Sequence, residues 1–203
     1  MVTLVNYGVG NIQAFRHIYT RLNLSVEIAS TSEVLARAKK IILPGVGAFD
    51  WTMTRLNQSG LRETLDGLVL QQQVPVLGVC VGMQMMAKSS EEGVLPGLGW
   101  IDAEVKRFDE TGFTQKTRLP HMGWNDVIPV REDPLFDGIE LPRYYFLHSY
   151  YLALVNAEHT LALTRYGSDF SSAVAKGHIY GVQFHPEKSH NWGIRLLKNF
   201  AEL

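Results

Sequence analysis

The segment Val74-Pro75-Val76-Leu77-Gly78-Val79-Cys80-Val81-Gly82 joins an apolar run to a helical pattern that begins near Met83. The run is apolar on both faces, which is typical of a central strand in a parallel sheet, and Pro75 fits only at its beginning. Glycine stands two residues to either side of Cys80. A sharp strand-to-helix turn needs this spacing, because side chains there would obstruct the close approach of the chain. We therefore expect Cys80 to project above the sheet.

The pattern on either side of this segment indicates the elements that surround it. Before it, short β-rich runs alternate with helical patterns, as in βαβ units of a parallel sheet. After residue 93, strand-like pieces separated by turns indicate antiparallel additions in the second half. The expected strands are 2–7, 26–29, 41–43, 74–79, 100–108, 121–128, 144–155 and 181–184, and the expected helices include 12–22 and 191–203. We expect one α/β domain over residues 1–203, with a three-layer, flavodoxin-like, mostly parallel sheet flanked by helices.

Composition and charge argue against several classes of protein. Of the 203 residues, 46% are apolar and 19% are charged, a balance typical of a globular domain with a sizeable core. The net charge is −1 and the basic residues are scattered, so a nucleic-acid partner is not expected. No apolar run is long enough to span a bilayer, and the start of the chain lacks a basic signal-peptide region. We therefore expect a cytoplasmic protein without a membrane partner.

Cys80 is the only cysteine, which excludes an intrachain disulfide. Its thiol is either a small buried hydrophobe or a reactive group. Thiolate is the attacking species, and a helix N-terminus favours thiolate through its partial positive charge and its N–H groups. The same helix start offers the backbone N–H of Val81 as a donor to an oxyanion. The glycine turn alone leaves both interpretations of Cys80 open, and a nearby base is needed to decide between them.

A base is suggested by His185-Pro186-Glu187, which follows the strand expected at 181–184. Residues two apart in an extended segment point the same way, so His185 and Glu187 can act as a pair. An imidazole next to a cysteine takes its proton and later protonates the departing amine, while a carboxylate fixes the tautomer and orientation of the ring. Alone, His185 would be an ordinary histidine, but together with Cys80 these residues form a candidate catalytic triad.

Cys80 in its glycine turn and the later His185-Pro186-Glu187 resemble the class I, or triad, glutamine amidotransferases, and the resemblance covers essentially the whole chain. Within that family, three segments look like the glutaminase subunits of imidazole glycerol phosphate synthases. They are Pro44-Gly45-Val46-Gly47-Ala48-Phe49, Gly82-Met83-Gln84 and Pro120-His121-Met122-Gly123-Trp124-Asn125. The resemblance implies hydrolysis of L-glutamine to glutamate and ammonia through a cysteine thioester, with no cofactor and no metal.

The resemblance also implies a partner and a set of site residues. The partner is a (β/α)8-barrel cyclase subunit that forms a heterodimer with this chain and uses its ammonia to make imidazole glycerol phosphate and an aminoimidazole carboxamide ribotide in histidine biosynthesis. The implied oxyanion residues are Val46, Gly47 and Val81; the implied glutamine pocket is Gly47, Gln84, Glu92, Tyr145, His148, Ser149 and Tyr150; and the implied partner interface is Asn11, Trp124 and Lys188.

Other interpretations remain at this point. The Cys-His-Glu machinery is shared across amide substrates, so another triad amidotransferase or a γ-glutamyl hydrolase is an alternative. A second is a regulatory module that kept the fold without the activity. A third is a metal site built from histidines, but no two of them show a ligand spacing supported by acidic or cysteine partners. The candidates for that site are His121, His148, His178, His185 and His190.

Overall fold

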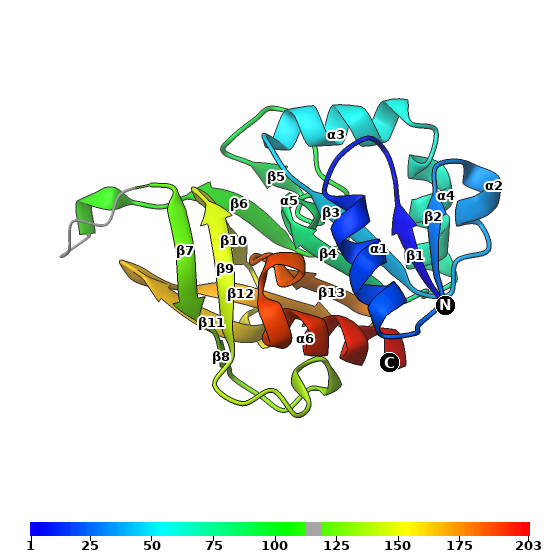
Figure 1. Cartoon of the computed structure of the whole chain (residues 1–203). Coiled ribbons are helices and arrows are strands. Elements are labelled where there is room, and N and C mark those ends of the chain that lie inside the picture. Colours follow the sequence, from blue (N-terminus) through cyan, green and yellow to red (C-terminus); the bar gives the residue numbers. More distant parts are fainter. Residues whose placement is uncertain (113–118) are drawn as a thin grey trace.

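A parallel sheet forms the centre of the computed structural model, which describes residues 1–112 and 119–203 (Figure 1). Its strands pair in the order β2–β1–β3–β4–β13, which is the flavodoxin-like order. They are β1 (Val2–Val5), β2 (Val26–Ala29), β3 (Ile41–Gly45), β4 (Val76–Cys80) and β13 (Ile179–Val182). Every residue of β1, β3 and β4 is buried, as expected for strands covered on both faces. The predicted fold class is confirmed.

Several strands differ from their expected bounds. The strand expected at 144–155 is two strands in different sheets, Arg143–His148 and Tyr150–Leu154, and the one expected at 121–128 ends at Asp126. The strand expected at 41–43 continues to Gly45, because Pro44 and Gly45 pair with Val79 and Cys80 of β4. Proline is tolerated here because the neighbour on the other side, β1, is in register with β3 only at Ile41 and Ile42. Pro44 therefore does not need to donate a hydrogen bond on that side.

Helices cover both faces of the parallel strands. In Figure 1, α1 (Ile12–Arg21) and α6 (His190–Glu202) lie side by side, and the Tyr19 hydroxyl of α1 donates a 3.0 Å hydrogen bond to the Leu197 carbonyl of α6. On the other side, α2 contacts α4 and α3 contacts α5. The remaining helical segments here are α2 (Ser32–Leu35), α3 (Phe49–Gln58), α4 (Arg62–Asp66), the π-helical turn η1 (Gly67–Gln71) and α5 (Val81–Gln84).

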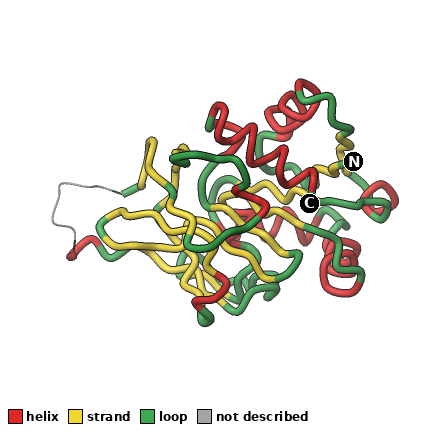
Figure 2. The backbone as a smooth tube through the Cα atoms, turned by 90° about the horizontal axis from the view of Figure 1, so that it is seen from below, coloured by secondary structure: helices red, strands yellow, loops and turns green. Residues whose placement is uncertain are grey.

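The second half of the chain adds antiparallel strands on one side of this core (Figures 1 and 2). The main sheet continues from β13 through β12, β10 and β6 to β5; β11 pairs with β12, and β8 pairs with β11. β7 and β9 form a separate ribbon. The hairpin of β11 and β12 was not predicted from the sequence. The strands are β5 (Ser89–Ser90), β6 (Ala103–Arg107), β7 (His121–Asp126), β8 (Ile128–Pro129), β9 (Arg143–His148), β10 (Tyr150–Leu154), β11 (Thr160–Tyr166) and β12 (Ser168–Lys176), and the short 3-10 turns are η2 (Glu110–Gly112), η3 (Pro134–Phe136), η4 (Ala157–His159) and η5 (Pro186–Lys188).

The turn between β4 and α5 has the strained geometry that its glycines suggest. Cys80 has φ +56° and ψ −116°, a conformation that non-glycine residues rarely adopt. A Cβ on Gly82 would lie 2.0 Å from the carbonyl oxygen of Leu43, so only glycine allows α5 to approach β3 this closely. The helix begins at Val81, two residues before the expected start, because Cys80 itself makes the turn; it spans only four residues.

We predict that Gly82→Ala lowers the free energy of unfolding by about 3 kcal/mol, because the added Cβ meets a backbone carbonyl that cannot move without distorting β3. Gly67→Ala is the matched control. Gly67 has helical angles (φ −60°, ψ −44°), and a Cβ there meets nothing within 4 Å. The control is expected to leave stability unchanged or to raise it slightly. Urea unfolding of both variants checks this, and equal stability of the two would contradict the proposed contact.

Candidate active site

Cys80 lies in a cavity of about 450 Å³ at the ends of β3 and β4, where segments distant in sequence converge. Ligands of open α/β sheets bind at this position, outside the carboxyl ends of the strands. Most of the residues assigned by resemblance line the cavity: Val46, Gly47, Cys80, Val81, Gln84, Glu92, His148, Ser149, Tyr150, His185 and Lys188. Pro120 and Leu147 also line it and were not singled out as site residues. The structure therefore brings together nearly all of the expected pocket.

His185 and Glu187 form a buried pair beside Cys80. The Nδ1 atom of His185 is 2.9 Å from Oε1 of Glu187, and each side chain is 3% exposed. Burial disfavours the charged ring, but hydrogen bonds and charge interactions with Cys80 and Glu187 outweigh it and raise the pKa of His185 to about 10. At neutral pH the ring therefore holds its proton and can give it to a departing amine.

The segment 44–47, which approaches the cavity from β3, is held at both ends by side chains. The buried Tyr7 hydroxyl donates to the Pro44 carbonyl, and the Thr52 hydroxyl of α3 is 3.3 Å from the Val46 carbonyl. Gly47 follows with φ +91°, in the region that favours glycine. The Val46–Gly47 peptide is thus held by one long hydrogen bond to its carbonyl and is followed by a glycine, which permits more than one orientation of the peptide. Neither Tyr7 nor Thr52 was identified from the sequence, because both contacts depend on how the segments pack.

Glu92 reaches the cavity from the loop after β5. Its Oε2 atom accepts a 2.9 Å hydrogen bond from the backbone N–H of Phe49, the first residue of α3. In return, the Asp50 carboxylate of α3 accepts hydrogen bonds of 2.9 and 3.0 Å from the N–H groups of Val94 and Leu95. These reciprocal contacts hold the Glu92 carboxylate at the cavity, where it can pair with an ammonium group.

A chain of buried side chains lies behind the wall of the cavity. The Nδ1 atom of His148 is 2.7 Å from the Tyr150 carbonyl, and its Nε2 atom is 2.9 Å from Nδ1 of His121. Nε2 of His121 is 3.1 Å from the Asn125 amide nitrogen. A carbonyl can only accept, so Nδ1 of each ring donates and each Nε2 accepts. Burial lowers the pKa of His121 to about 4 and that of His148 to about 3, so both rings are neutral at pH 7.

Tyr145 is the exception among the assigned pocket residues, because it does not line the cavity. Along β9, Tyr144, Phe146 and His148 are buried, whereas Tyr145 lies on the opposite face of the strand. Its ring lies 6.3 Å from that of Trp124, and the Lys188 ammonium is 5.8 Å from its centre. Tyr145 therefore groups with the residues assigned to the partner interface.

The interface residues occupy different places. Trp124 is 38% exposed and stacks on His190 at 5.1 Å, so it is not a core residue. Lys188 is exposed at the mouth of the cavity. Asn11 is exposed and caps α1 by accepting a 3.2 Å hydrogen bond from the N–H of Ala14. Asn11 therefore belongs to the start of α1, whereas the other two adjoin the β7–β9 ribbon.

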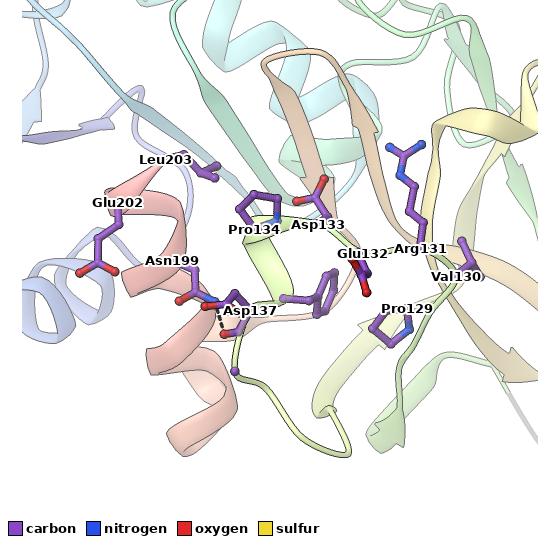
Figure 3. Close-up of a pocket in the computed structure, with 12 residues that line it drawn as sticks. Pro129, Val130, Arg131, Glu132, Asp133, Pro134, Asp137, Asn199, Glu202 and Leu203 are labelled. Carbon is purple, nitrogen blue, oxygen red and sulfur yellow. Dashed lines mark hydrogen bonds between the residues drawn. The ribbon is translucent and has the colours of Figure 1, made fainter.

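A larger cavity, of about 1200 Å³, lies between the loop 129–138 and the end of α6 (Figure 3). None of the candidate catalytic, pocket or interface residues lines it. Among the described residues, no three His, Cys, Asp or Glu side chains are grouped as ligands of a metal ion, although His121 and His148 do face each other. None of the helices described combines the length and apolar character needed to cross a membrane.

A Cys-His-Glu set at the carboxyl edge of a flavodoxin-like sheet defines the class of this protein. Residues 3–203 match the family model of glutamine amidotransferase class-I, and the chain belongs to that family. It is 56% identical to the imidazole glycerol phosphate synthase subunit HisH of Bdellovibrio bacteriovorus and 46% identical to that of Leptospira borgpetersenii, with all of each chain covered. The predicted enzyme class, a glutamine amidotransferase, is thereby confirmed.

Solved structures support the same fold. A structure described as a glutamine amidotransferase superposes with a TM-score of 0.74 at 20% identity, covering 100% of this chain and 99% of the other. A glutamine amidotransferase from Thermotoga maritima gives a TM-score of 0.64 at 18% identity, covering 99% of this chain and 80% of the other. At this level of identity the likeness concerns the fold alone.

The raised pKa of His185 predicts how stability depends on pH. A group whose pKa rises on folding contributes stability that is fully present below its ordinary pKa of 6.5 and is lost as the pH rises towards about 10. Glu187→Gln removes one of the groups that raise this pKa. We therefore expect the wild type to lose more free energy of unfolding than Glu187→Gln between neutral and alkaline pH.

Urea unfolding near pH 7 and near pH 9 measures this difference, and histidine NMR titration locates the midpoint of His185 directly. Glu132→Gln, which removes an exposed carboxylate, is the control and should behave as the wild type. A midpoint for His185 that is the same in Glu187→Gln and in the wild type would show that the carboxylate does not hold the proton on the ring.

Proposed function

We propose that this chain is the glutaminase subunit of an imidazole glycerol phosphate synthase and acts in the cytoplasm. It hydrolyses L-glutamine and delivers the ammonia to a (β/α)8-barrel cyclase, which makes imidazole glycerol phosphate and an aminoimidazole carboxamide ribotide for histidine biosynthesis. The names of its relatives support this assignment. The observation that carries it is the position of Cys80, which lies on a strained turn in a cavity beside the buried pair of His185 and Glu187.

Catalysis begins when the Cys80 sulfur attacks the carboxamide carbon of glutamine. The electron pair of the C=O bond moves to the oxygen, and the resulting oxyanion accepts hydrogen bonds from the N–H groups of Val81 and of the Val46–Gly47 segment. Protonated His185 then gives its proton to the amide nitrogen, the C–N bond breaks, and ammonia leaves. The product of this half-reaction is a thioester between Cys80 and the glutamyl group.

Water completes the cycle. Formation of the thioester removes the contribution of Cys80 to the raised pKa of His185, which favours the neutral ring that accepts a proton from water. The hydroxide attacks the thioester carbon, the S–C bond breaks, and glutamate is released. Cys80 recovers its thiolate and His185 its proton. Glu187 holds Nδ1 of the ring at 2.9 Å, which leaves Nε2 for the hydrogen bond between the ring and Cys80.

The cavity also suits the other end of glutamine. The α-ammonium group needs a carboxylate, and Glu92 offers one at the cavity wall. The α-carboxylate needs N–H donors, which the backbone around Ser149 and Tyr150 can supply. His148 lies in the same wall as a neutral ring, so it adds no competing positive charge.

A surface beside the cavity fits a partner. Met122 and Leu147 are neighbours across the β7–β9 ribbon, with 62% and 39% of their surfaces exposed, and Trp124 and Lys188 adjoin them. Exposed apolar and aromatic residues grouped in this way are typical of interaction sites. We propose that the cyclase docks here and near Asn11. Docking then shifts the Val46–Gly47 peptide from a resting orientation to one that donates to the oxyanion.

We predict that Cys80→Ala abolishes glutamate release, because no thioester can form. The variant is still expected to fold, to bind the barrel cyclase, and to support product formation when ammonium salts replace glutamine. Glutamate release by the purified complex and cyclase turnover on ammonium measure the two activities. Glutaminase activity near the wild-type level would refute the mechanism, while loss of the ammonium-dependent reaction would indicate a defect in folding or docking.

We predict that glutaminase activity is very low in the free chain and rises by orders of magnitude in the complex when the cyclase substrate is bound. Trp124→Ala and Lys188→Ala should each reduce this rise by about ten-fold or more, the size of effect expected for an interface anchor. Leu141→Ala and Lys106→Ala are matched controls, because Leu141 is 89% exposed and Lys106 lies on β6, outside the proposed docking surface. A free chain as active as the complex would refute the coupling.

A further inference from the structure

Gln183 is a buried polar residue that touches the nucleophile. Its Nε2 atom is 3.8 Å from the Sγ atom of Cys80, within hydrogen-bond range for sulfur. The residue is 0% exposed and does not line the glutamine cavity. It stands two residues before His185, so the base and this amide reach the sulfur from the same segment. The mechanism above does not use it.

The neighbours of Gln183 fix which end of its amide faces the sulfur. The Tyr150 carbonyl can only accept, so the amide nitrogen of Gln84 turns towards it at 3.1 Å. The same nitrogen is 3.0 Å from Oε1 of Gln183 and donates its second hydrogen there. With its oxygen engaged in this way, Gln183 points its NH₂ group at Cys80. The Tyr150 carbonyl thus fixes the orientation of the Gln84 amide, and Gln84 in turn fixes that of Gln183.

A hydrogen-bond donor in this position interacts more strongly with the thiolate form of Cys80 than with the thiol form. A thiol is a weak acceptor, whereas a thiolate is a full negative charge that accepts charge-assisted hydrogen bonds. Protonated His185 supplies one donor to Cys80, and the amide of Gln183 supplies a second from within the core. Because the amide is buried and held by Gln84, it does not need to reorganise when the charge forms.

We propose that Gln183 is a catalytic residue that stabilises the thiolate of Cys80 by donating a hydrogen bond to it. The inference rests on the proposed role of Cys80 as nucleophile and adds a residue to that site. It assigns Gln84 a second task, which is to orient Gln183 through the shared hydrogen bond. A purely structural role for Gln183 would instead be to fill the space beside β13.

Alkylation of Cys80 by iodoacetamide tests the inference on the intact chain, without glutamine or a partner. The thiolate attacks the CH₂ carbon, an S–C bond forms, and iodide leaves. Cys80 is the only cysteine, so incorporation measured by mass spectrometry reports this residue alone. Gln183→Met keeps the volume but removes the donor, and we expect alkylation at least about ten-fold slower than in the wild type, the size of one hydrogen bond to a charged group.

Gln183→Glu is the second variant, because it keeps the shape of the side chain and replaces the NH₂ group by an acceptor. It should be slowed at least as much as Gln183→Met. The control is Asn199→Asp, which makes the same amide-to-acid change at another buried site, where the amide donates to the Leu135 and Asp137 carbonyls. This variant should be alkylated at the wild-type rate. Circular dichroism identifies any variant that does not fold, and the remaining Gln183 variant then decides.

The direction of the change in alkylation rate distinguishes the proposed role of Gln183 from a purely structural one. If Gln183 only fills space, its replacement loosens the site and alkylation is unchanged or faster. Either outcome in a folded variant would overturn the proposal. Iodoacetamide lacks the amino-acid head of glutamine, so the test is independent of the glutamine pocket. Slower alkylation of the variants, in a protein whose wild-type complex with the cyclase and its substrate releases no glutamate, would support Gln183 and count against the proposed function alone.

Discussion

The left-handed backbone at Cys80 depends on the close approach of β3, β4 and α5. Gly82 lies against the Leu43 carbonyl, and a Cβ on Gly78 would lie 2.7 Å from the Gly82 carbonyl oxygen. A conformation such as that of Cys80 costs about 1–3 kcal/mol and persists only where the surrounding structure determines it. Buried parallel strands on both sides of β4 provide that support. The rest of the site is arranged around the sulfur position that this turn fixes.

Three buried histidines show that the neighbouring groups determine whether a buried imidazole ring is charged. His121, His148 and His185 are 3%, 6% and 2% exposed, so burial disfavours the charged form of all three rings. The pKa is nevertheless lowered in the first two and raised in the third. His121 and His148 meet each other and neutral amide or carbonyl groups, whereas His185 lies between Cys80 and Glu187. The same residue type thus serves as a neutral structural link in one place and as a proton donor in another.

The sequence predicted what depends on local pattern. Apolar runs and glycine spacing indicated the parallel strands and the turn at Cys80, and the His-x-Glu spacing indicated a pair on one face. Contacts between distant segments could not be predicted in the same way. Tyr145 was assigned to the pocket by resemblance, but it lies on the face of β9 opposite His148 and does not line the cavity. Gln183 left one signal, since a polar residue two before His185 shares its face in an extended chain, but its contact with Cys80 spans 103 residues.

The β7–β9 ribbon links the proposed docking surface to the catalytic base through the backbone. The N–H of His185 donates a 2.9 Å hydrogen bond to the Tyr145 carbonyl, and the N–H of Tyr145 donates at 3.0 Å to the Ser189 hydroxyl, which in turn donates to the His185 carbonyl. The ring of Tyr145 lies near both Trp124 and Lys188. A partner that presses on those side chains therefore acts on the strand to which the base is bonded. This path reaches His185 and is separate from the proposed shift of the Val46–Gly47 peptide.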